Sequence, residues 1–219
     1  MSSPVWRLDS CVLILRVGSQ WRSLPPNRGQ WNAVYKRFAR WAKVGAWSQL
    51  EELLAKEADL QEVSMDSTVT RAHACAAKSE AAAEALGRSR GGFSGKIHAV
   101  VDALGLPIKF ILTGGQEADI TQAIPLMEVS AQACLADKGY DSDAFPAWLH
   151  ERHIQVVIPP KANRKEQRSC DWWRYKERHV VECLFGTLKY FRRIAMRYEK
   201  KAIHFMAMLT FAAVLLWLR

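Results

Sequence analysis

Between residues 62 and 158 the sequence alternates short strand-like runs with helix-like stretches, and this order restricts the fold more than any other feature. Strand patterns are expected at 63–66, at 96–103 and 107–113 around a Leu104-Gly105 turn, at 133–136 and at 154–158. Helical patterns at 116–128 and 142–152 separate the later strands. Strands and helices in this order predict an α/β domain, in which helices flank a mixed sheet.

Helical patterns also lie on both sides of this region. On the N-terminal side, a helix at 31–44 is predicted by four aromatic residues at helical spacing: Trp31, Tyr35, Phe38 and Trp41. Gly45 would end this helix, and a second helix is expected at 47–58. Two short helices joined by a glycine-containing turn are typical of a helix-turn-helix-like unit, and an ordinary amphipathic pair with a solvated basic face fits the same spacing.

On the C-terminal side, residues 172–193 and 202–218 are each expected to form one helix. The second is almost wholly apolar from Phe205 onward. Its apolar stretch of about fourteen residues is shorter than the roughly 20 that a membrane span needs, so we expect a buried helix and no membrane partner. The chain is therefore expected to divide into a helical segment at 1–60 and an α/β domain at 61–219.

The charge of the chain favours an anionic partner. Lys and Arg total 31 against 22 Asp and Glu, which gives a net charge of +9. Residues 151–200 hold 13 of the basic and 6 of the acidic residues, interleaved with aromatic ones. Basic groups neutralise phosphates and aromatic rings stack on bases, so nucleic acid is the first candidate, although composition does not separate DNA, RNA and an acidic protein. Five scattered cysteines without a CxxC pair fit a reducing cytoplasm.

Three carboxylates stand at positions suited to chemistry. Asp66 ends the first expected strand, Asp137 ends the strand at 133–136, and Glu182 lies inside a long basic helix. Carboxylates at the ends of neighbouring strands point into one cleft, and a helix packed across those ends can add a third. Such clusters bind two Mg²⁺ ions roughly 3.5–4 Å apart and act on phosphodiesters. Each residue alone is weak evidence, because an Asp at a strand end is commonly a turn residue.

The helix around Glu182 has a more specific pattern. Tyr175 and Arg178 precede Glu182 by seven and four residues and Lys189 follows it by seven, so all four lie on one stripe about 60° wide. The apolar residues of this stretch cover the opposite face. Cations beside a metal-binding glutamate suit a phosphate backbone at an active site, whereas a solvated charged face gives the same pattern without chemistry.

Residues 87–92, Gly-Arg-Ser-Arg-Gly-Gly, form a basic glycine-rich segment. A nucleotide-binding P-loop requires GxxxxGK[ST], but Ile97 follows Gly95-Lys96 and position 90 is Arg, so no nucleotide cofactor is expected. The segment can still bring backbone N–H groups and the side chains of Arg88 and Arg90 near a phosphate, and a flexible connector is the alternative. No GxSxG motif supports a serine hydrolase.

Ordered blocks from Trp21 to Arg219 resemble bacterial insertion-sequence transposases of the DDE class, which have an RNase H-like catalytic fold. The spacing Tyr175-x2-Arg178-x3-Glu182-x6-Lys189 is similar to that family's signature around its third carboxylate. The other similar blocks are Met65-Asp66-Ser67-Thr68, residues 87–98, Asp102-Ala103-Leu104-Gly105, Leu112-Thr113-Gly114-Gly115-Gln116 with Asp119, residues 136–141, Ile158-Pro159-Pro160 and Arg192-Arg193-Ile194-Ala195.

The resemblance implies roles for individual residues. Asp66, Asp137 and Glu182 would be the catalytic residues and would bind two Mg²⁺ ions, with Mn²⁺ as a substitute. They would cleave phosphodiesters at transposon ends and join the freed 3′-hydroxyl to target DNA. A homodimer would bind double-stranded DNA at the nucleoid of a bacterial cytoplasm. The residues that would contact this DNA are Tyr175, Arg178, Lys189, Arg192, Arg193, Arg88, Arg90, Lys36, Arg37 and Arg40.

Only about twenty residues precede the Trp21-Arg22-Ser23-Leu24-Pro25 segment, fewer than family members usually have. We therefore expect residues 1–60 to be a partial DNA-recognition segment, which would impair activity. The alternative hypothesis is a truncated, non-catalytic DNA-binding derivative that competes for transposon ends. A generic RNase H-like nuclease is the third. The three carboxylates, all present, favour the catalytic hypothesis.

Overall fold

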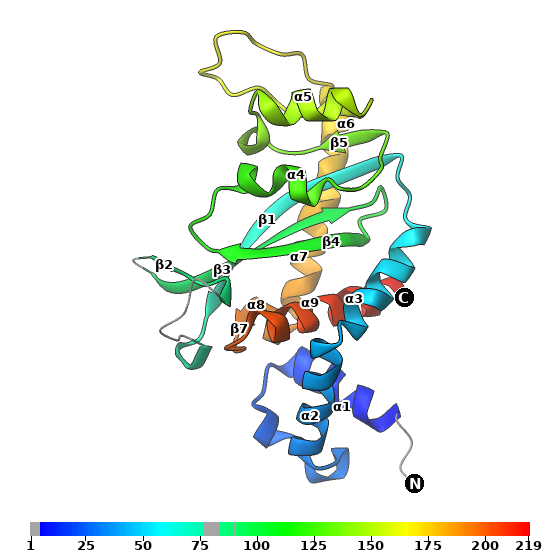
Figure 1. The fold of residues 1–219 in the computed structure, drawn as a ribbon, viewed down its shortest axis with the longest axis vertical. Helices are drawn as coiled ribbons and strands as arrows, with labels where there is room; N and C mark the ends of the chain where they lie inside the picture. The colour runs from blue at the N-terminus through cyan, green and yellow to red at the C-terminus, as the bar shows by residue number, and fades with distance from the viewer. Residues whose placement is uncertain (1–4, 77–83, 90) are drawn as a thin grey trace.

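The central strand of the protein, β1 (Glu62–Ala72), has partners along both edges (Figure 1). The computed structural model describes residues 5–76, 84–89 and 91–219. On one edge β1 pairs antiparallel with β3 (Gly92–Val101), which pairs antiparallel with β4 (Pro107–Gly114). On the other edge β1 pairs parallel with β5 (Ala133–Leu135), and β5 pairs parallel with β6 (Gln155–Val157).

Two short strands complete the sheet. β2 (Gly87–Ser89) pairs with the start of β3, and β7 (Met196–Arg197) pairs with the end of β1. The order β4-β3-β1-β5-β6, with an antiparallel meander followed by two parallel strands, is the RNase H-like arrangement. The predicted α/β class with a mixed sheet is therefore confirmed. A loop was predicted at 87–92, but residues 87–89 form β2 and β3 begins at Gly92, while residue 90 lies outside the described residues.

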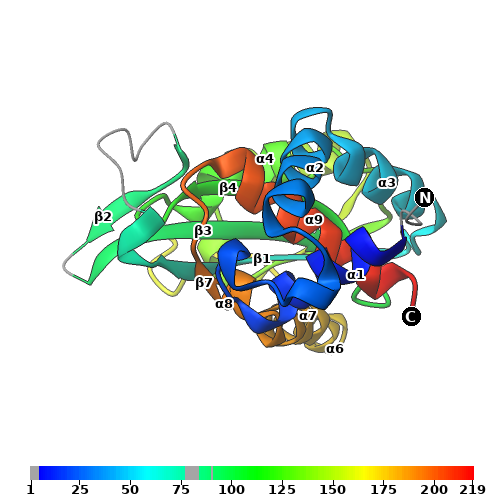
Figure 2. The ribbon, with the colours of Figure 1, turned by 90° about the horizontal axis from the view of Figure 1, so that it is seen from below.

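Helices cover both faces of the sheet (Figures 1 and 2). Val63 and Met65 of β1 pack toward α4 (Ala123–Leu126) and α5 (Ala144–Glu151). Ile97 and Ala99 of β3 pack toward α7 (His179–Tyr190) and α9 (Ala202–Trp217). Because side chains alternate along a strand, the residue after Met65 faces α7, and that residue is Asp66.

The basic segment 172–193 is not one helix. It consists of α6 (Trp172–Tyr175), a 3₁₀ turn (Lys176–Arg178), α7 and α8 (Arg192–Ala195). The Asp171 side chain caps α6, and the chain bends at Phe191, whose backbone is extended and whose ring is buried. The helix predicted at 116–128 is likewise reduced to a 3₁₀ turn (Asp119–Gln122) and α4, because Pro125 cannot donate within a helix.

The N-terminal segment contains α1 (Val5–Val17), α2 (Trp31–Lys43) and α3 (Ala46–Leu54). The predicted pair joined at Gly45 is present as α2 and α3. The segment shares one apolar core with α7, α8 and α9, and the Trp47 and Phe211 ring centroids are 4.2 Å apart. In a helix-turn-helix the second helix enters the major groove. Here the second helix packs on α9 and has no Lys or Arg, so α2 is the cationic helix of the pair.

Candidate active site

Arg178 joins two of the three predicted carboxylates. Its Nη1 donates to Asp66 Oδ2 at 2.9 Å, and its Nη2 donates to Glu182 Oε1 one helical turn away. Asp66 reaches this position from β1, whereas Arg178 and Glu182 come from the segment that crosses the sheet at α7. One guanidinium therefore neutralises two carboxylates that belong to different elements.

The environment of Asp66 disfavours the ionised form of its carboxyl group. Burial raises the pKa of Asp66, and the charge of Asp137 raises it further. The Ser67 backbone N–H, which donates to Asp66 Oδ1 at 2.7 Å, and Arg178 lower the pKa in part. The net shift is upward, and burial is its largest cause.

Asp137 lies two residues beyond Leu135, the last residue of β5, which pairs with Ser64 of β1. Its Oδ1 accepts the Gly139 N–H at 2.8 Å and so caps the turn at 138–140. A Cβ atom at Gly139 would lie 2.8 Å from this oxygen, so a larger residue at this position would require the Asp137 carboxylate to move. Asp137 is thus held at the carboxyl end of a parallel strand, where α/β sheets commonly bind ligands.

The donor set suits a hard divalent cation, because carboxylate oxygens are the protein ligands that Mg²⁺ prefers. Within the residues that the structure describes, no three His, Cys, Asp or Glu side chains are close enough to hold an ion as they stand. Glu182 is turned to Arg178, and its side chain is 58% exposed. It can therefore turn from the guanidinium without disturbing the core.

Comparison with known families identifies the chain. A family model described as Transposase DDE domain matches residues 57–174, more than half of the sequence. The chain belongs to the DDE transposase family. A second Transposase DDE domain model matches residues 134–219, and a model for transposases of the IS4/5 family matches residues 6–51. Together the matches include most of the three N-terminal helices and the whole sheet.

Individual relatives agree with this assignment. A Brucella ovis protein named as a transposase for insertion sequence element IS6501 is 39% identical over 128 residues, which are 57% of this chain and 98% of that protein. A Burkholderia cepacia protein named for IS402 is 34% identical over 120 residues, 49% of this chain and 54% of the relative. The Mos1 transposase paired-end complex aligns with a TM-score of 0.31 and 13% identity over 96% of this chain and 77% of that one. A match this weak does not enter the assignment.

The cations expected to contact DNA differ in how far this transposase exposes them to solvent. Lys189 and Arg192 are exposed, and Arg178 lies 5.7 Å from the centre of the Tyr175 ring. Arg193 is 5% exposed, and its Nε donates to the buried Glu199 at 2.5 Å. Arg193 is therefore part of the interior, and we do not include it in a DNA surface.

The remaining expected DNA contacts lie on other elements. Lys36 and Arg40 are exposed on α2, while Arg37 is half-buried and stacks over Trp41 at 5.8 Å. Arg88 is exposed on β2 and lies over the Phe93 ring at 5.9 Å. Arg90 is outside the residues that the structure describes. The exposed cations thus lie on β2, α7, α8 and α2.

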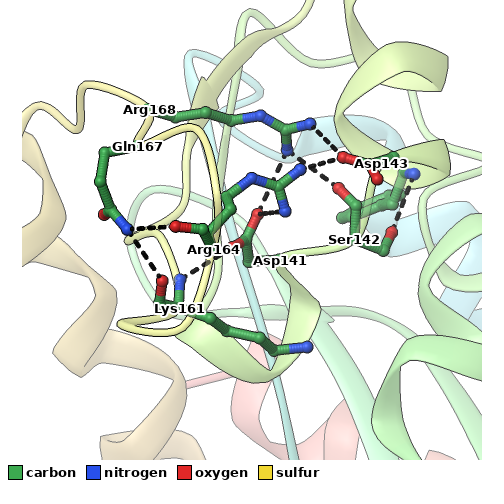
Figure 3. Close-up of polar contacts among 8 residues, drawn as sticks. Asp141, Ser142, Asp143, Lys161, Arg164, Gln167 and Arg168 are labelled. Carbon is green, nitrogen blue, oxygen red and sulfur yellow. Dashed lines mark hydrogen bonds and ion pairs between the residues drawn. The ribbon is translucent and has the colours of Figure 1, made fainter.

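An ion-pair network holds the segment at 161–170, which precedes α6 (Figure 3). The buried Asp141 accepts the Lys161 backbone N–H at 2.8 Å and pairs with Arg164 at 3.1 Å and Arg168 at 3.2 Å. Asp143 pairs with the same two arginines. The predicted basic loop at 161–170 is therefore tied to the start of α5, and two of its cations are already neutralised.

Asp119 is a further carboxylate near the site, for which the sequence indicates only a place in a block similar to the family. Asp119 Oδ1 accepts from Ser67 Oγ at 2.6 Å and from Lys96 Nζ at 2.9 Å. Burial raises the pKa of Asp119, but these two hydrogen bonds and the charge of Lys96 outweigh it, so the pKa is lowered overall. Burial lowers the pKa of the neighbouring His98 to about 4, so this imidazole is neutral at pH 7.

Proposed function

We propose that this chain is a DNA transposase that cuts at transposon ends and transfers the strand to target DNA. In the first step water attacks the scissile phosphorus, the phosphorus–O3′ bond breaks, and a 3′-hydroxyl and a 5′-phosphate result. In the second step that 3′-hydroxyl attacks a target phosphodiester, so one phosphodiester forms as another breaks. Neither step requires an oxidant or a nucleotide.

The observation that supports this proposal is that Arg178 links Asp66 of β1 to Glu182 of α7, while Asp137 follows the neighbouring strand β5. A phosphodiester is anionic, and attack on it builds further negative charge. Arg178 can donate in a planar, bidentate manner to phosphate oxygens once it releases a carboxylate. The guanidinium lies over the face of the Tyr175 ring, which favours its positive charge. The chain thus supplies both the ligand set and a cation beside it.

We propose that Asp66, Asp137 and Glu182 hold two Mg²⁺ ions, for which Mn²⁺ can substitute. Such ions, when bound, activate the attacking water and stabilise the leaving oxygen. The raised pKa of Asp66 means that this residue carries a proton more readily than an ordinary aspartate. Cation binding at Asp66 therefore releases that proton and becomes weaker as the pH falls.

The proposed partner is double-stranded DNA, both transposon end and target, bound by a homodimer in the cytoplasm. Tyr175, Arg178, Lys189 and Arg192 would contact the strand near the scissile bond. Lys36, Arg37 and Arg40 of α2 would contact the transposon end farther away, and Arg88 and Arg90 would contact the backbone beyond β2. No helix among the described residues has the length and apolar character of a membrane span.

The test begins with the DNA on either side of the reading frame. A supercoiled plasmid that carries this DNA is incubated with the full chain and Mg²⁺ or Mn²⁺, and products are mapped by primer extension. We expect cleavage at flanking inverted repeats by the natural chain and none by Asp66→Asn, with equal binding of both in gel shifts. Undiminished cleavage by Asp66→Asn would overturn the mechanism. Binding without cleavage by the natural chain would favour the non-catalytic derivative.

A further inference from the structure

A fourth carboxylate supports the site from the opposite face of β1. Asp66 faces α7, whereas its neighbour Ser67 faces the α4 side because strand side chains alternate. Asp119 lies on the α4 side, in the 3₁₀ turn whose Ile120 packs against that core. Ser67 Oγ donates to Asp119 at 2.6 Å, and the Ser67 backbone N–H donates to Asp66 Oδ1 at 2.7 Å. One residue thus joins the two carboxylates through the strand.

Asp119 is also fixed by β3. Lys96 Nζ donates to Asp119 Oδ1 at 2.9 Å and to the Glu117 backbone oxygen at 2.6 Å. The Lys96 side chain is only 12% exposed. An ammonium that is this buried needs a carboxylate partner, so the Lys96–Asp119 pair holds the 3₁₀ turn against the sheet.

Buried polar atoms surround this pair. His98 is fully buried, its Nε2 lies 2.9 Å from Thr113 Oγ1, and its Nδ1 lies 3.8 Å from Asp119 Oδ1. Among the residues that the structure describes, neither this Nδ1 nor the buried Tyr140 hydroxyl has a hydrogen-bond partner. Burial raises the pKa of Tyr140, and the charges of Asp119, Asp66 and Asp137 raise it further. The contact that connects Asp119 with the candidate active site is Ser67, which bonds both Asp119 and Asp66.

We propose that Asp119 is a positioning residue that orients Asp66 for cation binding through Ser67. This inference rests on the proposed function, because it assigns Asp66 as a ligand. Groups that orient a metal ligand without touching the metal commonly change metal affinity by 10- to 100-fold when they are replaced. Asp119→Asn keeps the size of the side chain but removes the charge that binds Lys96 and weakens the bond from Ser67. Ser67→Ala removes the link itself.

The matched control is Glu128. It pairs with Lys109 of β4 at 2.9 Å, which is the Lys96–Asp119 distance, but its side chain is 68% exposed. The experiment measures Mn²⁺ binding to the full chain by electron paramagnetic resonance, with thermal denaturation in parallel. We expect a roughly 10-fold weaker affinity for Asp119→Asn and for Ser67→Ala, with no further loss in the double variant. Glu128→Gln should bind Mn²⁺ like the natural chain.

Two results would overturn the inference, and they differ from failure of the proposed function. If Asp119→Asn lowers the melting temperature but binds Mn²⁺ normally, Asp119 has only a structural role. Additive losses in the double variant would show that Asp119 does not act through Ser67. A natural chain that binds no Mn²⁺ would overturn the proposed function and this inference with it. Partial recovery of DNA cleavage by Asp119→Asn at high Mn²⁺ would be a further supporting result.

Discussion

The Arg178 guanidinium and the Asp66 carboxylate are 2.9 Å apart although 112 positions separate them in the sequence. The contact connects the central strand with the helix that covers it. Both side chains are largely shielded, at 15% and 22% exposure. The pair therefore fixes how Glu182, one turn beyond Arg178, is presented to β1.

Replacing Arg178 should change the pH dependence of catalysis. Without the guanidinium, burial and Asp137 are opposed only by Ser67, so the pKa of Asp66 rises further. We expect Arg178→Ala to slow DNA cleavage about 100-fold and to move the acid limb of the pH–rate profile to higher pH. Arg178→Lys should recover little, because an ammonium does not present the planar fork that spans two carboxylates.

Arg174 is the control for this prediction. It lies one turn before Arg178 and donates to Glu62 at 2.6 Å, away from the three carboxylates. Arg174→Ala should leave the acid limb where it is in the natural chain. Cleavage rates from pH 5.5 to 8.5 provide the measurement. A profile for Arg178→Ala that falls equally at every pH would contradict the assigned effect on Asp66.

The sequence was sufficient for features that depend on local pattern. The pattern predicts Glu182 inside a helix, and it lies in α7. It predicts Asp66 at the end of a strand, but β1 continues from Glu62 to Ala72, so Asp66 lies within the strand and this prediction was wrong. Helix α1 was not assigned separately, because Cys11, Ile14 and Leu15 are buried and Val12 and Leu13 pack against the same core. A helix that is apolar almost all round has no 3.6-residue signal.

Other features depend on contacts between distant segments. Arg192 and Arg193 are adjacent and chemically identical, and only the packing of Glu199 and Trp21 places one in the interior. Asp119 contacts Ser67 across 52 positions. No periodicity in either segment encodes that contact, so sequence reasoning could note Asp119 in a block without assigning it a role.

Glu51 should make the protein less stable as the pH rises. It is 6% exposed on α3, and burial, followed by the charge of Glu52, raises its pKa from 4.5 to about 8. The folded chain therefore holds a proton that the unfolded chain releases, and stability is lost between pH 4.5 and 8. We expect Glu51→Gln to raise the free energy of unfolding by roughly 2–4 kcal/mol at pH 8 and hardly at all at pH 4.5.

Urea denaturation at the two pH values checks this prediction. Glu52→Gln, an exposed neighbour on the same helix, is the control and should change stability little at either pH. An equal gain for Glu51→Gln at both pH values would show that the ionised form of Glu51 is not the source of the penalty.

Gly139→Ala should disturb Asp137. The added Cβ would lie 2.8 Å from Asp137 Oδ1, so the carboxylate must turn and lose the Gly139 N–H. We expect a loss of about 1 kcal/mol in stability and about 10-fold in Mn²⁺ affinity. Gly186→Ala gives the contrasting result, because its Cβ has no neighbour within 4 Å and should stabilise α7 by about 0.5–1 kcal/mol. Thermal denaturation compares the two variants, and a stable Gly139→Ala with normal Mn²⁺ binding would refute the role of the turn.

Arg193→Ala should damage the fold rather than DNA binding. The Arg193 and Glu199 side chains are 6% and 4% exposed, so removal of the arginine leaves the buried carboxylate without its ion-pair partner, although the charge of Arg197 still acts on it. The expected loss in unfolding free energy is about 3–5 kcal/mol. Arg193→Lys should recover part of it, because the ammonium keeps the charge but cannot reproduce the contacts with the Trp21 and Tyr198 rings and the Ser19 carbonyl.

Arg192→Ala should have the opposite effect. Arg192 is exposed at the start of α8, so its loss should change stability by less than about 0.5 kcal/mol. If its guanidinium neutralises one phosphate, the slope of log binding constant against log salt falls by about 0.9. The slope is measured by fluorescence anisotropy with flanking DNA, over a salt range of roughly 50–200 mM. The two neighbours are thus separated by one pair of measurements, because the salt slope reports Arg192 and the unfolding free energy reports Arg193. A lower salt slope for folded Arg193→Lys, or a large stability loss for Arg192→Ala, would reverse the assignment.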